Sequence, residues 1–276
     1  MADTIIVGVT DAAASRRALD WAARRARDLG RRIVLFSVVG GAVGAVGEDD
    51  IVAQVVDATA ARLQAVAAEL AASGLDVAAE VANGDPVALL VAASSDAELL
   101  VIGGEPRGRG HRGQHGARIA AGAHCPVVVV PEPGDAPRRG VVVGVDGSET
   151  SSAAIAFAAT EAERLGEPLT VLAAWLPVAV PGDFGVYPDV YLTDLEGITR
   201  AGAERVAAEV TERHPGLEVL TDVSEGDPAQ VIGDSAESAS LVVVGSHGRS
   251  GFARFLLGSV SEEVVAHLAA PTAVVR

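Results

Sequence analysis

Runs of consecutive apolar residues alternate along this chain with longer stretches in which apolar residues recur every three or four positions. In the second half, the apolar runs predict strands near 141–145, 169–174, 217–223, 240–245 and 271–275. The periodic stretches predict helices near 150–165, 195–213, 228–238 and 259–269. The strands do not alternate with polar residues, which is typical of parallel strands covered by helices on both faces. We therefore expect a doubly wound α/β domain with five parallel strands.

The first half of the chain repeats this pattern in the same order. The apolar runs starting at Ile5, Leu99 and Pro126 match those starting at Val141, Leu241 and Pro271, and the turn Gly84-Asp85-Pro86 matches Gly226-Asp227-Pro228. Four ordered matches at a nearly constant offset indicate an internal duplication. We predict one domain at 1–130, a second at 141–276, and a linker at 131–140 that is marked by its proline and glycine residues.

The last strand of each copy, 126–130 and 271–275, would form a valine-rich sheet edge. Exposed apolar edges favour pairing with another strand. We expect the two copies to pack together as a pseudo-twofold pair, and the tandem chain to form a homodimer.

Composition narrows the function. The formal charge of −16 argues against nucleic acid and anionic membranes as main partners. We find neither a signal peptide nor an apolar run of about 20 residues, and Cys125 is the only cysteine, so a cytoplasmic location is expected. All 21 basic residues are arginine, which excludes a P-loop lysine and Schiff-base chemistry.

The spacing Gly245-x-x-Gly248, then nine residues, then Gly258-Ser259 is the most informative motif. It follows a predicted strand and precedes a predicted helix. Glycines let backbone N–H groups approach an anion, and the helix N-terminus adds unpaired N–H groups. Ser259 stands where an N-cap would stand, so its hydroxyl could cap the helix or contact a phosphate. A plain glycine-rich turn with a capping serine is the alternative.

A second polar group follows the first strand of the second copy, at Asp146-Gly147-Ser148. If the first and fourth strands are neighbours, Asp146 faces the glycine loop where the strand order reverses, which is where α/β sheets bind ligands. A carboxylate there suits a ribose hydroxyl or a metal ion. Alternatively, Asp146 and Ser148 only turn the chain and cap the next helix.

The glycine motif, the early Val145-Asp146-Gly147-Ser148 and the terminal valine strand together resemble the universal stress protein family in its tandem form. The resemblance implies a fold like that of the adenine nucleotide α-hydrolases, and ATP, with Mg or Mn, as the ligand. It places phosphate on Gly245, Gly248, Gly258 and Ser259, ribose or adenine on Asp146, and adenine on the backbone near Ala174. Val244 and Val260 would line the pocket, and Arg249 could pair with a phosphate. It implies no catalytic residue and no protein metal site.

The first copy departs from this motif. Its loop has Pro106 at the second glycine position, a spacer of six residues, and Gln114 in place of the serine. Proline lacks an N–H donor. Thr10 replaces the aspartate, and Asp11 follows one residue late. We expect the first copy to bind ATP much more weakly than the second, although the arginines of its loop could still attract an anion.

The sequence thus predicts a tandem universal stress protein that binds ATP in its C-terminal domain and acts with a further protein partner in stress regulation. A slow ATPase or nucleotidyl-transfer enzyme, in which Asp146 holds a divalent metal, is an alternative. A scaffold that has lost its ligand in both copies is another.

Overall fold

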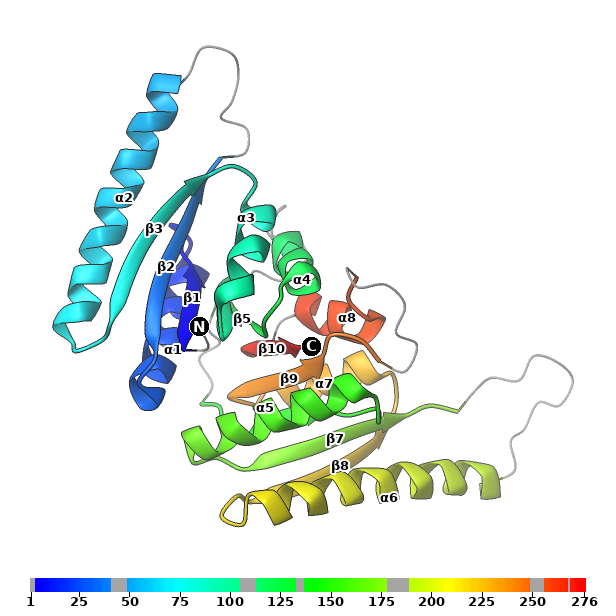
Figure 1. Ribbon diagram of the computed structural model, residues 1–276. Helices are drawn as coiled ribbons and strands as arrows, with labels where there is room; N and C mark the ends of the chain where they lie inside the picture. Colours follow the sequence, from blue (N-terminus) through cyan, green and yellow to red (C-terminus); the bar gives the residue numbers. More distant parts are fainter. Residues whose placement is uncertain are drawn as a thin grey trace, which may run out of the picture. The chain divides into compact units, whose positions relative to one another are not determined.

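A computed structural model describes residues 3–40, 49–104, 113–132, 137–177, 189–248, 256–267 and 269–276 (Figure 1). The chain forms two compact units, one in residues 1–134 and one in residues 135–252 and 258–276. Each unit is a parallel sheet with helices on both faces, as the alternation of apolar runs and periodic stretches predicts. No helix in the described part of the chain is both long enough and apolar enough to span a bilayer.

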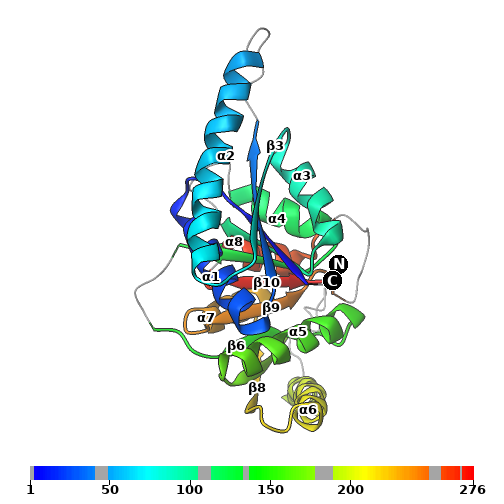
Figure 2. The ribbon, with the colours of Figure 1, turned by 60° about the vertical axis from the view of Figure 1, so that its left-hand side comes forward.

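The first domain alternates strands and helices from its beginning. Its elements are β1 (Thr4–Gly8), α1 (Ala13–Leu29), β2 (Arg32–Val39), α2 (Asp49–Ala72), β3 (Val77–Asn83), α3 (Pro86–Ala93), a short 3₁₀ turn (Ser94–Asp96), β4 (Leu99–Gly104), α4 (Gly113–Gly122) and β5 (Val127–Pro131). The strand order is β3-β2-β1-β4-β5, with every pair parallel. Helix α2 runs beside β2 and β3, while α3 and α4 lie together (Figures 1 and 2).

The second domain has the same order of elements. They are β6 (Val141–Gly144), α5 (Glu149–Leu165), β7 (Leu169–Trp175), α6 (Asp189–Arg213), β8 (Val219–Glu225), α7 (Pro228–Ala236), β9 (Leu241–Gly245), α8 (Ser259–His267) and β10 (Thr272–Val275). The strand order is β8-β7-β6-β9-β10, again parallel. The repeat found in the sequence is therefore a repeat of the whole domain.

The expected boundaries in the second domain lie within two residues of those in the structure, except at one helix. Helix α6 begins at Asp189 rather than near 195, directly after Pro188 in the sequence, and proline favours the start of a helix. Strand β8 begins at Val219, two residues after the expected start at 217.

Side-chain caps fix the start of the short helix in each domain that precedes the fourth strand. Asp85 accepts a hydrogen bond of 2.7 Å from the Ala88 N–H, and Asp227 accepts one of 2.9 Å from the Ala229 N–H. In both helices the first residue is proline, whose missing N–H is no loss at that position. The Gly-Asp-Pro turns of the sequence are therefore helix starts in both copies.

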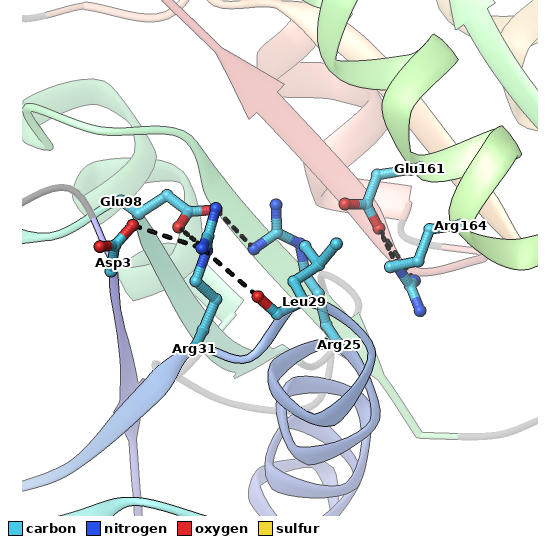
Figure 3. A network of polar contacts seen from close by, with 7 residues as sticks. All are labelled: Asp3, Arg25, Leu29, Arg31, Glu98, Glu161 and Arg164. Atoms are coloured by element: carbon cyan, nitrogen blue, oxygen red, sulfur yellow. Dashed lines mark hydrogen bonds and ion pairs between the residues drawn. The ribbon is translucent and has the colours of Figure 1, made fainter.

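In the first domain two arginines form ion pairs with one carboxylate (Figure 3). The Arg25 guanidinium, 4% exposed, lies 2.8 Å from Glu98 Oε1, and Arg31 Nε lies 2.7 Å from Glu98 Oε2. In the second domain, Arg164 forms a separate pair with the fully buried Glu161, at 2.9 Å.

Candidate nucleotide site

Strands β6 and β9 of the second domain are neighbours, so the turns that follow them lie at the same edge of the sheet. Val141 and Val143 on β6 stand opposite Leu241 and Val243 on β9. The strand order reverses between these two strands, since β7 and β8 lie beyond β6 while β10 lies beyond β9. The prediction for Asp146 required that the first and fourth strands of this domain be neighbours, and they are. The turn of Asp146 and the start of the glycine motif therefore both lie at the switch point of the sheet.

Asp146 is held in a tight turn after β6. Its Oδ1 accepts hydrogen bonds from the Ser148 N–H at 2.9 Å and from the Ser151 hydroxyl at 2.7 Å. Its own N–H donates to Ser151 Oγ at 3.1 Å. Gly147 has φ of +79°, a conformation that side chains disfavour, which lets the chain reverse within this turn. The carboxylate is half-buried and its orientation is set by these partners.

Ser148 caps helix α5, as the alternative interpretation of this turn predicted. Its Oγ accepts a hydrogen bond from the Ser151 N–H at 3.3 Å. The capping role accounts for Ser148. Asp146 makes the turn itself, as the same interpretation predicted, because its Oδ1 accepts the Ser148 N–H; its second carboxylate oxygen lies on the side of the glycine turn.

The described ends of the glycine motif are tied to each other and to the sheet. The Ser246 N–H donates to Val275 O at 2.6 Å, and the Gly258 N–H donates to Ser246 O at 2.8 Å. The Ser261 hydroxyl is placed 3.1 Å from Ser246 O and 3.0 Å from Gly258 O. Residues 249–255 lie between these ends and outside the described residues.

Glycine is required at Gly248 because the turn of Asp146 lies directly against it. A Cβ atom on Gly248 would lie 2.7 Å from Asp146 Oδ2, which is closer than real Cβ contacts come. A Cβ on Gly245 would lie 3.0 Å from Thr150 Oγ1. At Gly258 the nearest atom would be His247 Cα at 3.4 Å, an ordinary contact. The tightest requirement for glycine therefore falls where the two turns meet.

The remaining residues expected in the site are distributed around this junction. Val244 is buried in β9, Val260 is half-buried in the first turn of α8, and Ala174 is half-buried near the end of β7, the strand on the other side of β6. Ser259 is exposed and is the first residue of α8, so the expectation that it is the N-cap is wrong by one position: Gly258 takes that place, since its carbonyl oxygen accepts the first helical bond from the Glu262 N–H at 2.9 Å. The position expected for Arg249 lies outside the described residues.

Sequence reasoning missed two hydroxyl residues that join the parts of the site. The Thr150 hydroxyl donates to His247 O, and Ser261 reaches both ends of the glycine loop. Each lies in the first turn of a helix, where serine and threonine are common for capping alone. The sequence predicts that these residues lie near a helix start, but it does not predict which carbonyl oxygen accepts each hydroxyl.

The first domain keeps the fold of this edge with different polar groups. The Thr10 N–H donates to Ser15 Oγ at 2.8 Å, as Asp146 does to Ser151, and the Thr10 hydroxyl accepts from the Ala12 N–H at 3.3 Å, but the Asp11 carboxylate does not enter the turn and no side chain caps α1. Asp11 instead lies 2.5 Å from Arg62 of helix α2. A Cβ on Gly103 would lie 2.6 Å from the carbonyl carbon of Ala14, so the backbone of α1 lies against the end of β4. The loop with Pro106 and the arginines lies outside the described residues.

Together, the carboxylate, the glycine turn and the helix start that follows mark this as a doubly wound α/β domain whose polar groups meet at the switch point of a parallel sheet. The sequence profile described as "Universal stress protein family" matches residues 1–131 and again residues 137–276. This chain therefore belongs to the universal stress protein family and carries two of its domains in tandem.

Similar proteins support the assignment over the full length. A universal stress protein of Mycobacterium tuberculosis is 38% identical over 216 residues, covering 73% of this chain and 70% of that protein. Another, from Mycolicibacterium smegmatis, is 33% identical over 287 residues, covering 99% of this chain and 96% of that protein. The crystal structure of a universal stress protein from Archaeoglobus fulgidus has a TM-score of 0.71 at 20% identity and covers 100% of this chain and 97% of that chain. The last likeness concerns the fold.

Proposed function

We propose that the second domain binds ATP and that the chain acts as a nucleotide-binding regulatory protein in the stress response. The observation that carries the proposal is the contact of the two turns, in which Gly248 leaves no room for a side chain beside Asp146. The Gly248 N–H and the N–H groups of the α8 N-terminus would bind phosphate oxygens, whereas the Gly258 N–H is already donated to Ser246 O at 2.8 Å. The Asp146 carboxylate would accept hydrogen bonds from ribose hydroxyls.

The residues fit a nucleotide better than a bare inorganic anion. A free phosphate next to Asp146 would be repelled by the carboxylate, whereas a nucleotide carries ribose hydroxyls that donate to it. Mg or Mn accompanying the phosphates would reduce the remaining repulsion. The end of β7 near Ala174 offers backbone groups on the other side of β6, where an adenine ring would lie.

The test is the nucleotide content and affinity of the purified full chain. The protein is purified without added nucleotide and denatured, and the released molecules are identified by mass spectrometry. Calorimetric titration then gives the affinity for ATP and the number of sites. We expect about one ATP per chain, and a Gly248→Pro variant without bound ATP, because proline removes the N–H donor. A Gly233→Ala variant on α7, where an added Cβ meets no atom within 4 Å, is the control and should keep its ATP.

The outcomes separate the proposals. Two ATP per chain would show that the first domain also binds. No nucleotide in the parent and no binding on titration would refute the proposed function and favour a scaffold. If the protein released phosphate from ATP over many turnovers and Asp146→Ala abolished this, the proposal of a regulatory protein would be refuted and the chain would be an ATPase.

A further inference from the structure

We infer that Thr150 is a positioning residue that orients the Gly248 N–H toward the phosphates of the bound nucleotide; this inference rests on the proposed function. Thr150 lies in the first turn of α5, outside the glycine motif. Its hydroxyl donates to the carbonyl oxygen of His247 in the turn after β9. It therefore links the two turns of the site across the switch point of the sheet.

The direction of the Gly248 N–H follows from the planarity of the peptide bond. The His247 carbonyl and the Gly248 N–H belong to one peptide unit, and in a trans unit they point in opposite directions. The structure has no cis peptide bond among its described residues. Because Thr150 holds the carbonyl, the N–H is directed away from α5. No hydrogen bond joins this N–H to an acceptor within the described part of the chain.

The hydroxyl of Thr150 is also part of a series of hydrogen bonds that begins at the Ser151 N–H and ends at His247 O. The Ser151 N–H donates to Ser148 Oγ at 3.3 Å, and Ser148 Oγ lies 3.0 Å from Thr150 Oγ1. Since the one hydroxyl proton of Thr150 goes to His247 O, Thr150 is the acceptor in its contact with Ser148, whose hydroxyl also lies 3.4 Å from Ser151 Oγ. The Thr150 hydroxyl therefore contacts both the N-cap residue of α5, in the turn of Asp146, and the His247 carbonyl, in the glycine turn.

The first domain offers an internal comparison. Ala14 takes the place of Thr150 there, so no hydroxyl is present to hold the turn after β4. The backbone of Ala14 fills the space instead, since a Cβ on Gly103 would lie 2.6 Å from it. The domain that has lost the glycine motif has thus also lost its anchoring hydroxyl, whereas Ser15 keeps the equivalent of the Ser151 contact.

The test compares Thr150→Val, which keeps the shape and removes the hydroxyl, with Thr150→Ser, which keeps the hydroxyl. Calorimetric titration with ATP and with adenosine separates the part of the affinity that depends on phosphate. We expect Thr150→Val to weaken ATP about tenfold, the effect of losing one hydrogen bond, and to leave adenosine within about twofold. Thr150→Ser should bind both as the parent does. Equal loss of ATP and adenosine, or unchanged ATP binding in Thr150→Val, would overturn the inference.

A second readout keeps the inference separate from the proposed function. In ¹⁵N NMR spectra of the ligand-free full chain, the Gly248 amide resonance should move in Thr150→Val and stay in place in Thr150→Ser. An unmoved resonance in both variants overturns the inference whatever binds. If the parent binds no ATP but the resonance moves as expected, the proposed function fails while the anchoring of the turn stands.

Discussion

Replacing Gly248 by alanine tests the contact between the two turns in its simplest form. The added methyl carbon would lie 2.7 Å from Asp146 Oδ2, several tenths of an ångström inside normal contact. The carboxylate cannot move freely, because its other oxygen accepts bonds of 2.9 Å and 2.7 Å from Ser148 and Ser151. Each bond to a charged group contributes about 1.5–3 kcal/mol. We therefore expect Gly248→Ala to lower the free energy of unfolding of the second domain by about 1–3 kcal/mol.

A double-mutant cycle assigns that loss to the contact. In an Asp146→Ala background the obstructing oxygen is absent, so Gly248→Ala should have an effect of under about 0.5 kcal/mol. The assay is urea unfolding followed by the fluorescence of Trp175, in a Trp21→Phe background so that only the second domain reports. Gly233→Ala on helix α7, where a Cβ meets no atom within 4 Å, is the matched control and should be neutral or stabilising. Equal losses in both backgrounds would refute the steric reasoning.

Two further predictions concern the first domain. Glu98→Gln removes the charge shared by Arg25 and Arg31, and should lower the free energy of unfolding of this domain by about 1–3 kcal/mol, measured by Trp21 fluorescence in urea; an unchanged midpoint would contradict this. Burial raises the pKa of Cys125 from 9.0 to about 12, so the native thiol should resist alkylation at pH 8 and react on unfolding. Because the folded state then keeps a proton that the unfolded state loses, stability should fall between pH 9 and 12 by up to about 1.4 kcal/mol per unit, a slope absent in Cys125→Ala.

The fold was predictable because continuous apolar runs alternate with stretches of helical periodicity, and because this alternation occurs in both halves of the chain. A continuous apolar run such as Leu241–Gly245, separated from the next run by a helical stretch, is typical of a buried parallel strand. The start of α6 was not predictable from apolar spacing, because the first turns of a long helix beyond the sheet need no apolar stripe. Of the assembly, the pseudo-twofold pair and the homodimer remain predictions.

The candidate site was predictable in part, because glycine spacing in the sequence marks where backbone N–H groups would be exposed. Gly248 and Asp146 stand out in the sequence because one belongs to a fixed glycine spacing and the other to a polar turn, and each follows an apolar run. Thr150 and Ser261 do not stand out, since a hydroxyl near a helix start is ordinary and its partner is chosen by the tertiary fold. Spacing thus predicts where a ligand would bind, and only the structure shows which hydroxyls join the two turns.

The comparison of the two copies separates the hydroxyls that serve the fold from those that serve the site. Ser15 and Ser151 make the same bond to the N–H that follows the first strand, at 2.8 Å and 3.1 Å, although the residue bearing that N–H is Thr10 in one copy and Asp146 in the other. A contact that persists when the carboxylate is lost belongs to the strand-to-helix turn itself. The hydroxyl of Thr150 is lost together with the carboxylate. We therefore expect substitution of Ser15 or Ser151 to lower stability in either domain, and substitution of Thr150 to act on the ligand.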